Sequence, residues 1–453
     1  MDQAGERKTE STQKWHGKVL HQSVFEGTAC ALPFRVIGKT MPEPLSPQSR
    51  RTFHNELWRS LPAGVLDSMS STFGMLIAVR VFHLGHVEKS IFLSATSGGL
   101  ITSLFVVPLL MRARGSIAQT AALVQMLGGA CMAVSAFFSE SPWTFIIGLS
   151  LGLFCFSMQI PLMTQLYRLN YPVERRGRLY SITGVTRAAS AVGFGFFGGW
   201  LVGLDLENYR WLLWCFAASG FISGWWTYSL PATDWQAEGS AHTSFGSALR
   251  WVKLDRDFRT LLISWMMMGI GNLVACCLFV EFLANPKHGF DVPERTVAWI
   301  TGVVPVTLRM LTSYPWGLIY DRVGLFKVRA ILNVIFAVSI IIFFMGDNVF
   351  MWSLGMALWG LANAGGNVTW GLWVTKLAPK HAVAEYMSVH SFLTGVRGLL
   401  APFLAFAAIE VMSFEMLSWL CAAAILSASA FITVRARSSS EESTRRLGPG
   451  ERL

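Results

Sequence analysis

The stretch WGLIYDRVGLFKVR, residues 316–329, interrupts a chain that is apolar on both sides of it. Residues 296–315 before it and residues 330–346 after it are apolar enough to enter a bilayer, which a helix of about 20 residues crosses. The stretch therefore predicts a short charged turn between two membrane-spanning helices. Its charged and glycine positions are Gly317, Asp321, Arg322, Gly324, Lys327 and Arg329.

The composition of the whole chain agrees with a membrane protein. Of its 453 residues, 53% are hydrophobic and 14% are charged, whereas soluble domains carry about 25% charged residues. The net charge of +10 comes mostly from basic residues that flank apolar runs, which is typical of membrane topology and argues against a nucleic-acid partner. The seven cysteines show neither metal nor redox spacing, so we expect no metal site and no cofactor.

Twelve segments are long and apolar enough to be spanning helices, and one long polar connection divides them six and six. We therefore predict an all-α membrane protein with 12 transmembrane helices in two pseudo-symmetric six-helix bundles. The predicted spans lie near residues 60–82, 90–111, 117–138, 142–167, 179–203, 209–230, 259–283, 296–320, 328–345, 349–377, 386–410 and 414–434.

Polar segments set the predicted domain boundaries. Within the linker, ALRWVKL (248–254) predicts an amphipathic helix on the membrane surface. Lys and Arg concentrate in the loops on the side of the termini, so we expect both termini in the cytoplasm and the protein in the plasma (inner) membrane. The expected parts are a disordered cytoplasmic tail without a secretory signal (1–58), a first bundle (59–231), a cytoplasmic linker (232–258), a second bundle (259–435) and a cytoplasmic tail (436–453).

The two halves resemble each other weakly. PLLMRARG (108–115) corresponds to GLIYDRVG (317–324) at an offset of 209, and TGVTR (183–187) corresponds to TGVR (394–397). Two parallel six-helix repeats around a midplane binding site are a known transporter architecture.

The pattern Gly317-x-x-x-Asp321-Arg322-x-Gly324-x-x-Lys327-x-Arg329 resembles the loop signature of the major facilitator superfamily, here between spans eight and nine. PVERRGRLYS (172–181) is similar to the loop after span four in many members. The resemblance implies a transporter in which spans 1, 4, 7 and 10 line a central cavity, with 2, 5, 8 and 11 beside it. Two features depart from the family: MRARG in the first half lacks the acid, and span five lacks the Gly-Pro of the antiporter branch. Proton antiport of drugs is therefore not supported.

Three arginines, Arg187, Arg309 and Arg397, lie deep within predicted spans. A charge at that depth costs about 2.5–3.5 kcal/mol on insertion scales, so each one needs a partner. Guanidinium groups that face a cavity hold an anionic solute through two parallel bonds, and we predict them as substrate-binding residues. The alternative is that they pair with Asp67 and with helix carbonyls as structural contacts.

Span ten carries a polar and aromatic face. Asn363 and Asn367 are four residues apart, and Trp370 and Trp373 follow at intervals of three, so the four side chains share one side of a helix. Amides beside indole rings are suited to a polar or aromatic solute, and we predict these residues as part of the substrate site. The alternative is interhelical hydrogen bonding by the amides and ordinary packing by the indoles.

Asp67 and His390 are the candidates for coupling to H+ or Na+. For Asp67, expected at a shallow cytoplasmic depth, a gate or helix-pairing role fits equally, and a lone His in a span is commonly just hydrogen-bonded. Three further charges, Arg80, Glu281 and Glu410, lie about one turn from the outer ends of spans. There we expect them to reach water by snorkelling.

The resemblance also implies a cytoplasmic gate that includes the charged turn at 317–329. The turn would lie near the start of span five, whose helix N-terminus carries about half a positive charge, so that Asp321 would contact that terminus and Arg178. The repeat predicts a sister contact of reversed sign between Arg112 and Glu385. The alternative is that all four are solvated loop charges, worth about 0–1 kcal/mol per pair.

These patterns predict a secondary active or facilitative transporter that moves a small polar solute, with an anion as the candidate class, by rocker-switch alternating access. Its partners would be the solute, the lipid bilayer and a coupling H+ or Na+, and we expect a monomer without catalytic residues. A transport-inactive sensor or assembly factor on the same fold is an alternative. A membrane-embedded enzyme fits less well, because the spans hold no HxxxD, HxxH or nucleophile–base pairing.

Overall fold

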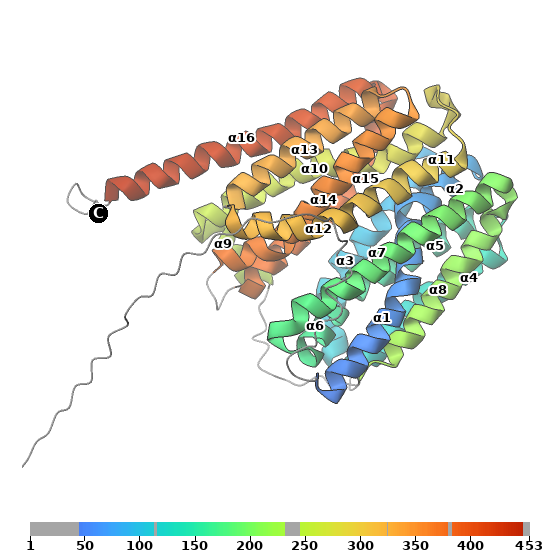
Figure 1. Cartoon of the computed structure of the whole chain (residues 1–453), viewed down its shortest axis with the longest axis horizontal. Coiled ribbons are helices and arrows are strands. Elements are labelled where there is room, and N and C mark those ends of the chain that lie inside the picture. The colour runs from blue at the N-terminus through green and yellow to red at the C-terminus, as the bar shows by residue number, and fades with distance from the viewer. Residues whose placement is uncertain (1–44, 113–115, 232–244, 324, 379–382, 447–453) are drawn as a thin grey trace, which may run out of the picture. The chain divides into compact units, whose positions relative to one another are not determined.

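The structure, a computed structural model, describes residues 45–112, 116–231, 245–323, 325–378 and 383–446. Every regular element in these ranges is helical, which confirms the predicted all-α class (Figure 1). The elements of the first half are α1 (Pro47–Ser68), η2 (Met69–Phe73), α2 (Gly74–Arg80), α3 (His86–Arg112), α4 (Ile117–Phe137), α5 (Pro142–Met158), α6 (Ile160–Asn170), α7 (Val173–Leu204), η3 (Leu206–Asn208) and α8 (Tyr209–Tyr228). Those that follow are α9 (Phe245–Leu254), α10 (Arg256–Ala284), η4 (Pro286–His288), α11 (Glu294–Ala298), η5 (Trp299–Val303), α12 (Val304–Arg322), α13 (Leu325–Met345), α14 (Val349–Leu377), α15 (Val383–Val411) and α16 (Phe414–Arg446).

These elements make twelve passes, in agreement with the twelve predicted spans. Three passes consist of several helices in direct succession: α1, η2 and α2; α5 and α6; and α11, η5 and α12. Within the described ranges, nine passes are long and apolar enough to cross a membrane by length and composition alone. The other three are α3, α8 and α14, which occupy the positions of predicted spans two, six and ten.

The first pass begins earlier than predicted. Helix α1 starts at Pro47 instead of near residue 60, and Ser46 caps it by accepting a hydrogen bond from the backbone N–H of Ser49 at 3.2 Å. Serine followed by proline at the first helical position is a typical helix start, but the polar residues after it carry no hydropathy signal. Residues 47–58 therefore belong to the first bundle and not to a tail. As a consequence, Asp67 lies near the middle of the pass and not at a shallow depth.

The two halves repeat the same pattern of neighbours. In the first half, α1 packs on α7 and α8, α4 packs on α5 and α8, and α3 packs on α5. In the second half, α10 packs on α15 and α16, α13 packs on α14 and α16, and α12 packs on α14. Each pair of the first half thus has its counterpart at the same position of the second, and Figure 1 shows the helices of each half gathered together, blue to green and yellow to red. This is the predicted pair of pseudo-symmetric six-helix bundles.

A row of glycines on α7 brings the halves close together. Gly195, Gly199 and Gly203 follow at intervals of four, and they face Val303, Ala298 and Arg295 of the eighth pass. A Cβ atom on Gly199 would lie 2.9 Å from the Cβ of Ala298, which is closer than side chains normally approach. Small residues at this spacing let two helix backbones pack tightly within a membrane. The second contact between the halves joins α3 to α15.

The linker contains the helix that its amphipathic pattern predicted. Helix α9 packs on α15 and α10, and the ring of Trp251 lies 5.5 Å from that of Tyr386. Asp255 directly follows α9 and caps α10 by accepting a hydrogen bond from the N–H of Phe258 at 3.0 Å. The Tyr386 hydroxyl donates to the other carboxylate oxygen of Asp255 at 2.7 Å. One face of α9 is therefore held by the second half.

Candidate functional site

Ion pairs close one end of the space between the halves. We call this the outer end, after the predicted topology; it holds the last turn of α2, the first turn of α3 and the last turn of α10. Lys89 donates to Glu281 at 2.8 Å, and both side chains are buried. Asn285 donates to the same carboxylate at 2.6 Å, and Arg80 pairs with Asp291 at 2.7 Å.

These contacts correct the expectation that Arg80 and Glu281 snorkel to water, because both side chains are buried or nearly so. Glu281 is fully buried, and Glu410, which is exposed, pairs with His86 of the other half at 2.6 Å. The sequence placed each charge near a span end but gave no sign that a partner from the other half would meet it. We call the pairs Arg80–Asp291, His86–Glu410 and Lys89–Glu281 the outer seal.

Two π-helical turns face each other beneath the outer seal. η2 interrupts the first pass and η5 interrupts the eighth, and the Thr301 hydroxyl donates to that of Thr72 at 3.3 Å. Gly302 lies against Thr72, because a Cβ atom there would come within 3.1 Å of the threonine oxygen. A π turn widens the helix by one residue and is frequent at functional sites. Here η2 begins two residues after Asp67, and η5 ends six residues before Arg309.

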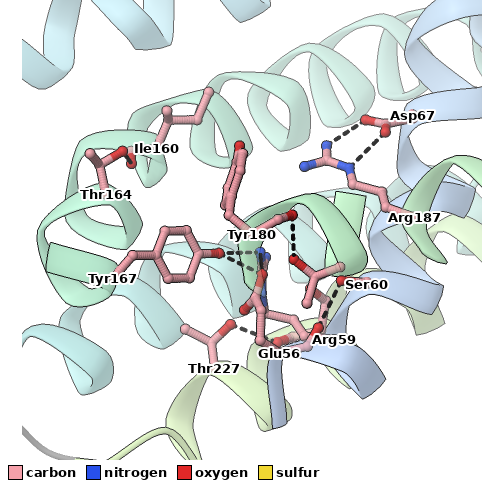
Figure 2. Close-up of polar contacts among 12 residues, drawn as sticks. Glu56, Arg59, Ser60, Asp67, Ile160, Thr164, Tyr167, Tyr180, Arg187 and Thr227 are labelled. Atoms are coloured by element: carbon pink, nitrogen blue, oxygen red, sulfur yellow. Dashed lines mark hydrogen bonds and ion pairs between the residues drawn. The ribbon is translucent and has the colours of Figure 1, made fainter. Parts of the chain in front are cut away.

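A cavity in the first half is lined by charged side chains of α1 and α7 (Figure 2). Arg187 donates from Nε to Asp67 Oδ2 at 2.7 Å and from Nη2 to the other carboxylate oxygen, so the pair has bidentate geometry. Both side chains are partly exposed to the cavity, with 45% and 34% of their surface accessible. This is the pairing that the structural alternative had anticipated for Arg187.

Arg309 of α12 faces this ion pair from the second half. It is close enough to interact electrostatically with both Asp67 and Arg187, and it is half-buried. Among the described residues, no carboxylate forms an ion pair with Arg309 and no acceptor bonds its side chain. The group of three side chains, which we call the cavity triad (Asp67, Arg187 and Arg309), therefore carries one uncompensated positive charge.

A buried network that the sequence analysis missed lies about two to three turns before Asp67 on α1. Arg59 donates to Glu56 from Nε at 2.7 Å and from Nη2 at 2.6 Å, and Nη2 also reaches the Tyr167 hydroxyl at 3.1 Å. The Tyr167 hydroxyl donates to Glu56, and Figure 2 shows the three side chains meeting beside the cavity. A spacing of three between Glu56 and Arg59 was a usable signal, but it fell in the segment assigned to the tail.

The four predicted residues of span ten differ in their exposure. Asn367 is exposed, and Asn363 is half-buried and donates to the backbone oxygen of Trp359 on its own helix at 2.8 Å. Trp370 is half-buried, with its ring 5.7 Å from that of His390. Trp373 is fully buried, so it is placed to pack and not to touch a solute.

The remaining deep residues gather inside the second half. Arg397 is 8% exposed and donates to the backbone oxygen of Trp265 at 2.6 Å, which is the helix-carbonyl contact of the structural alternative. His390 is buried next to Trp265 and Trp373. Arg329 was predicted as part of a cytoplasmic loop, but it lies within α13 and is only 2% exposed. None of these residues joins the cavity triad through a described contact.

The predicted cytoplasmic gate lies largely outside the described residues. Gly324 and the side chains of Asp321, Arg112 and Glu385 fall outside them, so neither gate contact is tested. Arg178 is exposed near the start of α7, and Arg322 and Lys327 are exposed around the turn. Gly317 faces open space on α12. Within the described ranges, no cluster of three His, Cys, Asp or Glu could hold a metal ion.

Comparison with known proteins agrees with the helical fold. The sequence model of the Major Facilitator Superfamily matches residues 275–452. The solved structure of the nucleoside transporter NupG matches with a TM-score of 0.67 at 14% identity, covering 85% of this chain and 98% of that one. The second half of the chain thus resembles the superfamily in sequence, and the whole described chain shares the fold of that transporter. These matches and the long apolar helices agree with an integral, multi-pass membrane protein.

Other members of the superfamily give comparable matches. A D-xylose–proton symporter has a TM-score of 0.64 at 12% identity, covering 85% of this chain and 97% of that one. A POT family transporter, solved with a thioalcohol-conjugated peptide, has a TM-score of 0.65 at 12% identity, covering 86% and 96%. At these identities the likeness concerns the fold alone. No curated protein matches the chain.

Proposed function

We propose that this protein is a major facilitator superfamily transporter that moves a small anionic solute by alternating access, and that the cavity triad holds the anion. The observation that carries the proposal is the position of Arg309, which faces the Asp67–Arg187 pair without an acid of its own. Charges within a membrane protein usually pair with one another or serve the transported species. An anion between Arg309 and Arg187 would complete the charge balance of the triad.

The geometry leaves hydrogen-bond donors for such an anion. Asp67 occupies Nε and Nη2 of Arg187, and the third guanidinium nitrogen bonds none of the side chains drawn in Figure 2. Arg309 offers its whole guanidinium group from the opposite half. A carboxylate or phosphate would accept from both arginines, since guanidinium groups match the planar geometry of these anions. Asn367, which is exposed on α14, would bond a polar part of the solute.

Alternating access follows from where the halves touch. In the described part of the chain, the hydrogen bonds between the halves involve the outer seal, the threonines of the π turns and the contact of Ser94 with the backbone of Leu399. The cavity would therefore face the cytoplasm in this conformation. Rocking the halves about the triad would break the outer seal and form the predicted cytoplasmic gate of Asp321 with Arg178, and of Arg112 with Glu385.

Asp67 supplies a coupling step in this proposal. A proton on its carboxylate would remove the charge that holds Arg187, and the freed guanidinium would bind the anion. Solute and proton would then occupy the triad together and cross together. His390 is less suited to coupling, because it is buried among aromatic rings of the second half.

We further propose that the protein acts as a monomer in the plasma (inner) membrane with both termini in the cytoplasm. The distribution of Lys and Arg supports this orientation.

The test combines a ligand screen with a substitution that keeps the charge. We expect a small carboxylate or phosphate to raise the melting temperature of the purified protein, because a ligand stabilises the state that binds it. Arg309→Lys keeps the positive charge but loses the planar guanidinium group, which can donate two parallel hydrogen bonds to one anion. We expect it to weaken binding and uptake roughly ten- to a hundredfold, which corresponds to about 1.5–3 kcal/mol. Arg256→Lys, on an exposed residue of the second half that belongs to neither the triad nor the predicted gate, is the matched control. If no anion shifts the melting temperature, or Arg309→Lys transports normally, the anion proposal is wrong.

A further inference from the structure

The second half contains a cluster of buried cationic groups that the cavity triad does not use. Arg329 of α13 and Arg397 of α15 are 2% and 8% exposed, and His390 of α15 is 1% exposed. They surround Trp265 of α10 and Trp373 of α14. We call these five residues the tryptophan–arginine cluster.

The two guanidinium groups share one indole ring. Arg329 stacks on Trp265 with its Cζ atom 3.3 Å from the ring centroid, and the Cζ atom of Arg397 lies 6.0 Å from the same centroid. Gly269 makes room for Arg397, because a Cβ atom there would lie 1.8 Å from Nη1. The two like charges are therefore held close together by packing, and an indole face stabilises a desolvated cation by only about 2 kcal/mol.

The hydrogen-bond groups of the cluster that lack partners are nearly all donors. They are Nε and Nη2 of Arg329, Nε of Arg397, Nε2 of His390 and Nε1 of Trp373. Arginine and indole nitrogens donate only, and a protonated or Nε2-protonated imidazole donates as well. Buried polar groups are normally satisfied, and a buried charge is normally paired. Neither arginine forms an ion pair with an Asp or Glu whose side chain the structure describes.

A series of contacts between aromatic rings connects the cluster to one acid, Asp255, and this acid already has hydrogen-bond partners. Trp373 packs on Phe258, which packs on Tyr386, and the Tyr386 hydroxyl bonds Asp255. Asp255 also caps α10, so its two oxygens have partners on the far side of these rings. The cluster thus has a surplus of donors and of positive charge, with aromatic rings as its walls.

We propose that the tryptophan–arginine cluster binds a small inorganic anion. The anion would accept hydrogen bonds from Arg329, Arg397 and the Nε1 of Trp373, and it would offset the two buried charges. An ion of halide size is the candidate and not a phosphate, because the ring centroids of Trp265, Trp373 and His390 lie only 5.0–6.2 Å apart. The anion would be a fixed part of the second half that ties α10, α13, α14 and α15 together. This inference is independent of the proposed transport of an anion at the cavity triad.

The first experiment is a halide titration of the purified full-length protein. The melting temperature is followed as sodium chloride replaces sodium gluconate at constant ionic strength. We expect a saturable rise for the wild type and for Arg309→Gln, and loss of the saturable rise for Arg329→Gln. Sulfate and phosphate arms identify the size of ion that the cluster accepts. A rise that disappears in Arg309→Gln but persists in Arg329→Gln would overturn the proposal and assign the effect to the cavity triad. Absence of any saturable rise in the wild type would overturn it as well.

The second experiment does not depend on whether Arg329→Gln folds. Crystals of the wild-type protein grown in bromide should give an anomalous diffraction peak within hydrogen-bond distance of Arg329 and Arg397. A peak there supports the proposal. An empty cluster, or an acidic side chain in contact with both arginines, contradicts it.

Discussion

At the scale of single residues, a charge was predictable where it interrupts an apolar run. Arg187 and Arg309 could be identified because every other residue around them is apolar or small. Glu56 and Arg59 were missed in spite of their spacing of three, because they lie in a polar stretch that hydropathy assigns to the tail. The burial of Arg329 was equally hidden, since a basic residue at a span end normally snorkels.

The first residue-scale prediction concerns Asp67. Asp67→Asn removes the carboxylate that holds Arg187, so the triad keeps two unpaired guanidinium groups at every pH. We expect an anionic solute to bind as tightly as before or more tightly, while a pH gradient no longer drives its accumulation. Uptake into proteoliposomes with a pH gradient is compared with counterflow exchange without one. Asp347→Asn, on an exposed loop, is the control. Normal pH-driven accumulation in Asp67→Asn would show that Asp67 does not carry the proton.

The second residue-scale prediction concerns the network of Glu56, Arg59 and Tyr167. Glu56→Gln leaves the guanidinium of Arg59 buried without its carboxylate, which typically destabilises a protein by about 3–5 kcal/mol. We expect a clear drop in the melting temperature of the purified protein. Combining Glu56→Gln with Arg59→Met should recover much of it, because an apolar side chain of similar length carries no charge to bury. If the double variant is as unstable as Glu56→Gln alone, the two side chains stabilise the protein through contacts other than their own ion pair.

At the scale of elements, hydropathy located all twelve passes but not what interrupts them. The π turns η2 and η5 add a residue to a helix without changing its composition, so no pattern in the sequence marks them. The start of α1 was missed because the hydropathy signal begins more than a turn after the helix does. The glycines of α7 were visible in the sequence, but their partner helix was not.

The element-scale prediction uses two glycines of the same helix. Gly199→Val would place a side chain where a Cβ atom is already 2.9 Å from Ala298, so α7 must move away from α11. Gly193→Val is the matched control, because Gly193 faces open space. We expect Gly199→Val to raise the reactivity of a cysteine at Thr72, which is fully buried in η2, toward a thiol reagent added from the outer side. Equal labelling of Thr72→Cys in both backgrounds would show that the glycine row does not hold the halves together.

At the scale of the whole molecule, the weak sequence repeat predicted that corresponding helices of the two halves would have corresponding neighbours. The offsets between PLLMRARG and GLIYDRVG, and between the two TGV segments, connect helices that have the same neighbours in their own halves. What the sequence did not show is how the halves meet, because that depends on side chains far apart in the chain, such as Lys89 and Glu281. Alternating access requires a set of contacts between the halves at each end of the space between them. The two sets cannot form at the same time.

The last prediction compares the outer seal with the proposed cytoplasmic gate. Glu281→Gln leaves Lys89 buried without a charge partner and should open the outer seal, raising the outer-side labelling of Thr72→Cys. Glu410→Gln is the matched control, because the His86–Glu410 pair is largely exposed and such pairs contribute only about 0–1 kcal/mol. Asp321→Asn weakens the proposed cytoplasmic gate and should lower the same labelling, because the outward-open state loses its closure. If both closures act on one equilibrium, Glu281→Gln combined with Asp321→Asn should label between the two single variants. Labelling of the double variant equal to that of Glu281→Gln alone would show that Asp321 takes no part in closing the cytoplasmic side.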